Sequence, residues 1–266
     1  MAKSRRPKVM MPLPSFDFDP SEAAITWQVL NDNGVDVFFA TPDAKPAVAD
    51  PRMLHGTGLS VFKRILMARQ DAVSACLAMY AETNFRNPLP YKKVSEAGFD
   101  GLVLPGGHAQ GMRIYLEAPE LHKVTSAFFA KKKPVAAICH GVVLAARSKR
   151  KDGKSVLFGR KTTALLKKQE MAAYNLTRLW LGTYYRTYTE TTVQEEVTAA
   201  LASPKDFLTG PKPDIRRDSP KNKKPGFTVV DGNYISARWP GDAYSFAHGF
   251  LQLLRKSGNP SVSISD

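Results

Sequence analysis

The chain has 266 residues, 43% of them hydrophobic, and a formal net charge of +14 at pH 7. A chain of this length buries a large core without cross-links, so its two cysteines, both in apolar segments, favour a reducing, intracellular compartment. We find no apolar stretch long enough for a signal sequence, nor about 18 uncharged apolar residues in a row for a membrane span. These features predict a cytoplasmic protein that does not enter a membrane.

The basic residues could mark a nucleic-acid-binding surface, because clustered lysine and arginine attract phosphates. They fall instead in separate loops such as SRRPK and SPKNKKPG, without interleaved aromatic residues that would stack on bases. Solvated loops are the favoured interpretation. Nucleic-acid binding stays a hypothesis. It predicts that the affinity of the protein for nucleic acid falls steeply as the salt concentration rises.

From the N-terminus to residue 149, strand and helix patterns alternate. Short apolar runs predict strands, and apolar residues at helical spacing predict helices. Asp19 or Ser21 can cap the first helix, Gly34 suits its end, and Cys76 lies on the apolar face of the second. The expected elements are strands at 7–14, 35–42, 99–107 and 133–139, helices within 15–34, 67–84, 118–133 and 140–149, and a loop at 42–60. This alternation predicts an α/β fold with a doubly wound, mainly parallel sheet sandwiched by helices.

The remaining residues are less regular and predict additions to that sheet. Extra helices are expected at 170–185 and 193–203, a proline- and lysine-rich loop at 203–226, a β-hairpin at 227–240 and a final helix ending at Gly258. Repeats and linkers are lacking, so one domain over residues 1–266 is expected.

Three candidate features follow strands and should meet at the carboxyl edge of the sheet, where open parallel sheets bind ligands. They are Glu22, the Gly106-Gly107-His108 turn and the Cys139-His140-Gly141 turn. Cys139 opens a helix, where backbone N–H groups favour a thiolate, and Gly141 permits close backbone approach. The alternative is an ordinary core cysteine. His140 can reach the sulfur only if the turn is irregular, and otherwise orients substrate or contacts a partner subunit.

The other two features also have a functional and a structural interpretation. The glycine turn can offer backbone N–H groups to an oxyanion, or can be an ordinary tight turn. Glu22 can simply favour the start of its helix, or can lie beside the Cys139 sulfur as a hydrogen-bond donor or general base. No ligand spacing supports a metal site at His108 and His122.

Four segments in order, residues 19–42, 99–112, 133–141 and 229–243, resemble the DJ-one/ThiJ/PfpI superfamily, with its flavodoxin-like, class I glutamine amidotransferase-like domain. The PGGH string and the length look closest to the heat-shock-chaperone and glyoxalase III branch. The resemblance implies that Cys139 is the nucleophile, that Glu22 touches its sulfur, that Gly107 and His108 bind the oxyanion, and that His140 adjoins the thiol. It also implies a homodimer and conversion of methylglyoxal to lactate without a cofactor.

Two departures from related patterns limit what the resemblance implies. Glu170 is the only acid in residues 159–170, where the branch would supply a third acidic site residue. Residues 187–211 also differ from the pattern of that branch, which indicates a separate subfamily with its own substrate. The chain lacks the GxCxG and His-x-Glu patterns that glutaminases share, so amidotransferase activity is not expected. The leading hypothesis is a cysteine enzyme that acts on small reactive carbonyls. The alternative is a stress-related holdase chaperone or a cysteine redox sensor.

Overall fold

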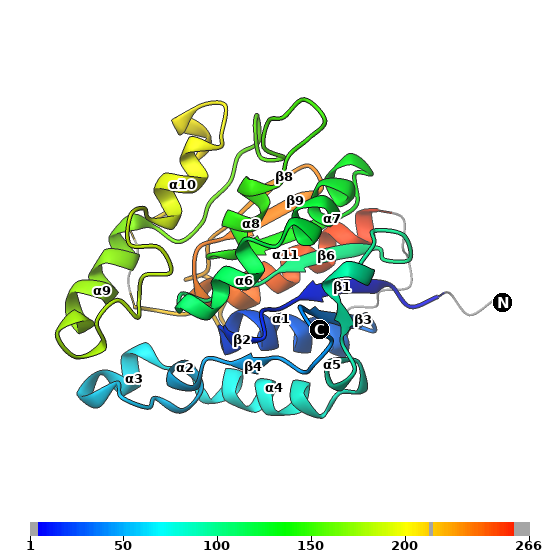
Figure 1. The fold of residues 1–266 in the computed structure, drawn as a ribbon. Coiled ribbons are helices and arrows are strands. Elements are labelled where there is room, and N and C mark those ends of the chain that lie inside the picture. Colours follow the sequence, from blue (N-terminus) through cyan, green and yellow to red (C-terminus); the bar gives the residue numbers. More distant parts are fainter. Residues whose placement is uncertain (1–4, 213–214, 258–266) are drawn as a thin grey trace.

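A computed structural model describes residues 5–212 and 215–257, which fold around a seven-stranded sheet (Figure 1). The strand order is β5-β3-β1-β6-β7-β9-β8, and every neighbouring pair is parallel except the antiparallel hairpin β8–β9. The strands are β1 (Lys8–Pro12), β3 (Asp36–Thr41), β5 (Leu89–Pro90), β6 (Gly101–Leu104), β7 (Val135–Ile138), β8 (Thr228–Asp231) and β9 (Tyr234–Ala237). The predicted mainly parallel sheet and its added hairpin are confirmed.

Helices cover both faces of this sheet. Helices α1, α4 and α11 pack together on one face, and α6, α7 and α8 lie on the other (Figure 1). Their bounds are α1 (Pro20–Asp32), α4 (Gln70–Ala81), α6 (Arg113–Leu116), α7 (Pro119–Ala130), α8 (Gly141–Arg147) and α11 (Ala243–Lys256). Gly258, the expected end of the last helix, lies outside the described residues.

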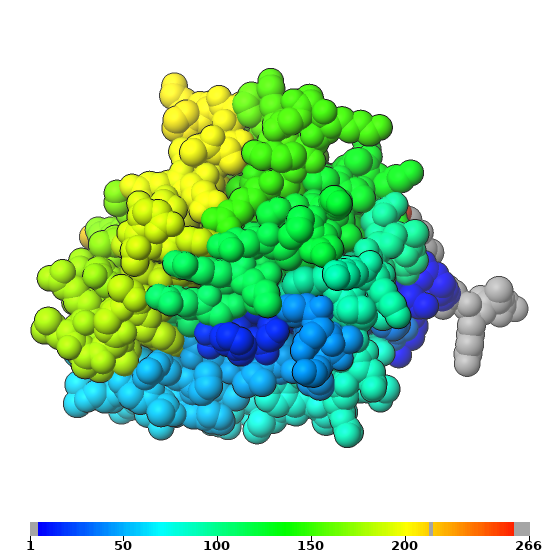
Figure 2. Space-filling model, viewed as in Figure 1, coloured from blue at the N-terminus to red at the C-terminus, as the bar shows by residue number. Residues whose placement is uncertain are grey.

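The short helix α5 (Thr83–Arg86) packs against α4 and β3. Further helices extend beyond the sheet at one end of the molecule. They are α2 (Pro51–His55), α3 (Lys63–Leu66), α9 (Lys167–Leu181) and α10 (Val193–Ala199) (Figure 1). Figure 2 shows α9 resting on the α2–α3 segment, where Phe62 and Trp180 stack with ring centroids 5.9 Å apart. None of the helices described is both long and apolar enough to cross a bilayer.

The core forms because the central strands carry side chains that avoid water on both faces. Every residue of β6 and β7 is buried, and Cys76 lies in the same cluster, as its place on an apolar helix face predicts. The predicted loop at 42–60 is wrong in part. Asp50 caps α2 through the backbone N–H groups of Arg52 and Met53, and β4 (Val48–Ala49) pairs with β2 (Phe16–Phe18) in a second small sheet.

Candidate active site

Cys139 lies on a sharp turn between β7 and α8, with a φ of 56°, a conformation that L-residues other than glycine seldom adopt. The turn is held from β9, because the Cys139 backbone N–H donates to the Ala237 carbonyl at 3.1 Å. Helix α8 begins directly against β6. A Cβ atom on Gly141 would lie 2.0 Å from the Leu104 carbonyl oxygen, so only glycine fits there. The close approach expected of Gly141 is present.

The irregular turn brings His140 back to its neighbour. The Nδ1 atom of His140 lies 3.4 Å from the Cys139 sulfur, a contact that adjacent residues on a regular helix could not make. Burial lowers the pKa of His140 to about 3, assisted by the positive charges of His108 and Arg147. The imidazole is therefore neutral at pH 7, and its Nδ1 atom is placed to share a hydrogen bond with the Cys139 thiol.

Glu22 reaches the same place from the first turn of α1. Asp19 caps that helix by accepting from the N–H groups of Ser21 and Glu22. The Oε2 atom of Glu22 accepts from the Gly106 N–H at 2.8 Å, whereas its Oε1 atom is buried and has no hydrogen-bond partner in the part of the chain described. A Cβ on Gly106 would be 2.8 Å from Oε2 and 2.9 Å from the Cys139 Cβ, so the acid and the cysteine converge on this glycine.

The protonation of Cys139 and Glu22 differs from what the sequence predicts. The start of α8 was expected to favour the thiolate, yet burial raises the pKa of Cys139 well above its usual value, as do the negative charges of Glu22 and Asp19. Burial likewise raises the pKa of Glu22, and the charge of Asp19 adds to this. Desolvation and like charge outweigh the helix N-terminus here, so acid and thiol compete for the same proton.

The glycine turn presents unused backbone donors. Within the described ranges, neither the Gly107 nor the His108 backbone N–H has a hydrogen-bond acceptor. Gly107 must be glycine, since a Cβ would lie 2.5 Å from the Asp17 carbonyl oxygen. His108 is fixed by Thr187, which donates to its carbonyl at 2.6 Å, and by Tyr185, whose ring stacks on its imidazole at 4.4 Å. Two fixed N–H groups of this kind can bind a developing oxyanion.

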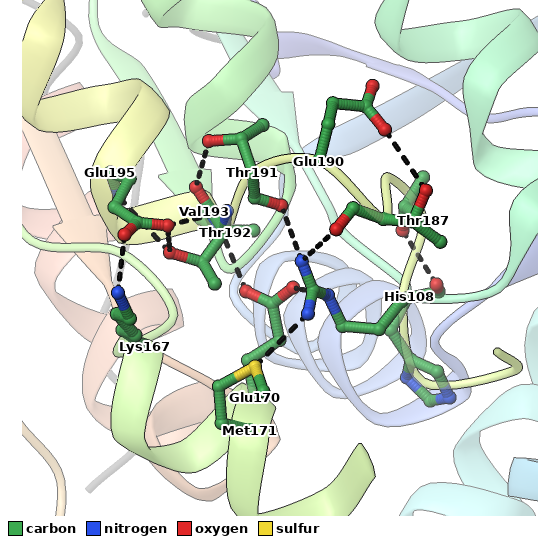
Figure 3. Close-up of polar contacts among 12 residues, drawn as sticks. His108, Lys167, Glu170, Met171, Thr187, Glu190, Thr191, Thr192, Val193 and Glu195 are labelled. Atoms are coloured by element: carbon green, nitrogen blue, oxygen red, sulfur yellow. Dashed lines mark hydrogen bonds and ion pairs between the residues drawn. The ribbon is translucent and has the colours of Figure 1, made fainter. Parts of the chain in front are cut away.

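Glu170 lies at the same cavity but has other partners. Its Oε1 atom forms an ion pair with the Arg186 guanidinium at 3.1 Å, and its Oε2 atom accepts from the Val193 N–H at 2.9 Å (Figure 3). Burial raises the pKa of Glu170 to about 7, while the Val193 N–H and Arg186 act in the opposite direction. Hydrogen bonds from Glu170 to Cys139 or His140 are absent among the residues described.

A cavity of about 390 Å³ opens beside the sulfur. Cys139, Glu22, Gly107, His108 and Glu170 line it, whereas His140 borders a separate void of about 10 Å³ that Glu170 also lines. The sequence prediction missed other lining residues, namely Asp19, Tyr185, Arg217 and Trp239. Trp239 follows β9, so the rule that ligands bind beyond carboxyl ends of strands could have found it. The described residues hold no cluster of three potential metal ligands.

The mainly parallel sheet with a cysteine on the sharp turn after β7 can be compared with known protein families. Residues 13–211 match the family model described as ThiJ/PfpI family-like, and the chain belongs to that family, which confirms the predicted superfamily. It is 29% identical to a deglycase from Thermococcus kodakarensis over 63% of this chain and 69% of the relative, and 27% identical to the deglycase PfpI from Pyrococcus furiosus over the same shares.

Solved structures extend the likeness across the whole fold. The crystal structure of glyoxalase III from Candida albicans matches with a TM-score of 0.64 at 17% identity, covering 93% of this chain and 97% of that one. The Rapid Encystment Protein of Francisella tularensis matches with a TM-score of 0.67 at 18% identity, covering 93% and 99%. At these identities the likeness shows a shared fold.

Proposed function

We propose that the protein is a cofactor-independent cysteine enzyme that acts on reactive carbonyl compounds, with α-oxoaldehydes such as methylglyoxal as the simplest substrates. The observation that carries this proposal is the convergence of the Cys139 sulfur, the His140 Nδ1 atom and the unpartnered Glu22 Oε1 atom at the turn beside the cavity. Relatives named as deglycases and a structural neighbour named glyoxalase III support the substrate class.

The reaction begins when the Cys139 sulfur attacks the aldehyde carbon. The thiol proton passes to the carbonyl oxygen by way of the Glu22 carboxyl group, which gives a hemithioacetal. The Gly107 and His108 N–H groups stabilise negative charge on that oxygen as it develops. A base then moves a proton from the aldehyde-derived carbon to the neighbouring carbonyl carbon. The hydroxyl proton of the hemithioacetal passes to the neighbouring oxygen, which yields a thioester of a 2-hydroxy acid. Water hydrolyses this thioester, so the sum is R–CO–CHO + H₂O → R–CHOH–COOH.

We assign roles to the two groups by their positions. Glu22 lines the cavity beside the sulfur, and its side chain interacts with the Cys139 thiol, so Glu22 is assigned as the base at carbon. His140 contacts the sulfur but does not line that cavity, so its assigned role is to position the thiol. A carboxyl group with a raised pKa suits its role, because general bases work best when their pKa lies near the operating pH.

Glu170 is proposed as a positioning residue. Both of its oxygen atoms are engaged, one with Arg186 and one with Val193, so neither is free to take a substrate proton. The pair instead fixes α9 and the 186–193 segment, and that segment holds His108 through Thr187 (Figure 3). A change at Glu170 should therefore act on stability before it acts on chemistry.

The test measures lactate formed from methylglyoxal by purified protein. Cys139→Ala should abolish turnover, and Glu22→Gln should lower kcat by about 10²- to 10⁴-fold, the usual contribution of general acid–base catalysis. Cys76→Ala is the matched control, because this thiol is buried but does not line the cavity, and it should keep the wild-type rate. Unchanged turnover in Cys139→Ala would exclude the mechanism.

The alternative functions have less support. A redox sensor needs an accessible, readily ionised thiol, whereas Cys139 is 4% exposed and its pKa is raised by burial. The holdase activity and the homodimer that the resemblance implies stay predictions.

A further inference from the structure

The cavity beside Cys139 is larger than the simplest substrate requires. Methylglyoxal has five non-hydrogen atoms, which fill at most about 150 Å³ if each takes the space of a water molecule in the liquid. The cavity holds about 390 Å³, within the range of roughly 300–1,000 Å³ typical of sites for larger organic ligands. More than half of the volume would stay empty around methylglyoxal.

Four side chains of the cavity carry a buried polar atom without a hydrogen-bond partner in the described ranges. These atoms are Glu22 Oε1, His108 Nε2, Gln169 Oε1 and the Tyr185 phenol oxygen. Buried polar atoms are normally paired, because an unpaired one loses its water without compensation. Four of them at the cavity that holds the thiol fit a ligand whose reacting end is polar.

Much of the remaining lining is apolar. Helix α9 contributes Ala172, Ala173 and Leu176, α3 contributes Ile65 and Leu66, and Trp239 comes from the end of β9. The other polar side chains at the cavity are Asp19, Ser21, Lys168, Gln169, Glu170 and Arg217. Leu176 and Ile65 are 41% and 51% exposed, so the apolar wall runs from the interior to the surface. This wall can take up a hydrocarbon body.

We infer that the preferred substrates are amphipathic α-oxoaldehydes, with the dicarbonyl at Cys139 and an alkyl or similar apolar body against α9 and α3. This inference rests on the proposed function, because it takes the attack of Cys139 on an aldehyde as given. The chemistry is unchanged: one water is consumed and the product is the corresponding 2-hydroxy acid. The apolar body supplies binding energy that methylglyoxal lacks.

The experiment compares kcat/KM for methylglyoxal, 2-oxopentanal and 2-oxooctanal, with 2-hydroxy acid formation as the readout. Each methylene group that leaves water should raise kcat/KM by about fourfold until the cavity is full. At ten non-hydrogen atoms, 2-oxooctanal occupies at most about 300 Å³ and still fits. Cysteine-dependent turnover that stays level or falls with chain length would overturn the inference while leaving the proposed function in place.

Two matched variants locate the effect. Leu176→Asp puts a charge in the apolar wall and should lower the kcat/KM ratio of 2-oxooctanal to methylglyoxal by at least tenfold. Leu179→Asp makes the same change three residues along α9, at a side chain that is 91% exposed and outside the cavity lining, and should leave the ratio unchanged. Equal ratios in the two variants would place the apolar body elsewhere and refute the inference.

A binding measurement separates the two proposals. The Cys139→Ser protein, which lacks the nucleophile, is titrated with lactate and with 2-hydroxyoctanoate. Tighter binding of 2-hydroxyoctanoate, weakened in Cys139→Ser/Leu176→Asp, supports the apolar site even if no aldehyde is turned over, in which case only the proposed reaction fails. Equal binding of the two acids contradicts the apolar site.

Discussion

The buried ion pair between Arg186 and Glu170 should make Arg186→Met one of the most destabilising single changes outside the hydrophobic core. The two side chains are 9% and 2% exposed, and at pH 9, above the raised pKa of Glu170, the substitution would leave the Glu170 carboxylate buried without a counter-charge. Breaking a buried pair in this way costs about 3–5 kcal/mol. Arg186 also donates to the Thr189 and Thr191 carbonyls at 3.0 Å, but those residues lie near the surface, where water can replace the bonds. The ion-pair contribution therefore dominates.

Urea unfolding at pH 9 measures the loss of stability. Arg186→Met should lower the free energy of unfolding by about 3–5 kcal/mol, and adding Glu170→Gln should restore at least half of it, because the double variant buries no unpaired charge. The control is Arg150→Met at the exposed Arg150–Asp152 pair, where a loss below about 1 kcal/mol is expected. A loss below about 1 kcal/mol for Arg186→Met, or single-variant losses that simply add in the double variant, would refute the reasoning.

Two further changes test the geometry around the sulfur. Gly141→Ala places a Cβ 2.0 Å from the Leu104 carbonyl oxygen, so α8 must shift, and we expect a loss of about 1–3 kcal/mol in urea unfolding together with slower alkylation of Cys139. Wild-type stability and reactivity would contradict the packing. Asp19→Asn keeps the helix cap but removes a negative charge that raises the pKa of Glu22, so the acidic limb of the kcat/KM profile should move to lower pH. A limb that stays in place would show that Glu22 is not the group titrated.

The sequence predicted the sheet because its strands are short apolar runs separated by helical periodicity. That pattern also located the edge where Glu22, Gly107 and Cys139 meet, since parallel strands end on the same side. The small strands β2 and β4 were missed. They have three and two residues, too few to show a periodic pattern, and they form through pairing with each other.

The pKa values of the site residues depend on contacts between residues far apart in the sequence, which no local sequence pattern indicates. The partner of Glu170 is Arg186, which lies beyond the end of α9, and the pairing requires the chain to turn back after that helix. The pKa of Cys139 is raised because the fold encloses the sulfur with two acids, and local sequence indicates only the helix start beside it. Sequence reasoning located the reacting groups but could not determine their protonation.

The two edge strands of the central sheet, β5 and β8, affect how copies of this chain can associate. Strand β5 has only two residues and ends in Pro90, which has no N–H to offer, and at the other margin Arg160 donates to the Asp231 carbonyl of β8. Neither margin presents a long row of free backbone groups on which another strand could add. Among the residues described, a further strand would find few backbone groups to pair with at β5 and would compete with Arg160 at β8, which disfavours fibril-like growth by strand addition.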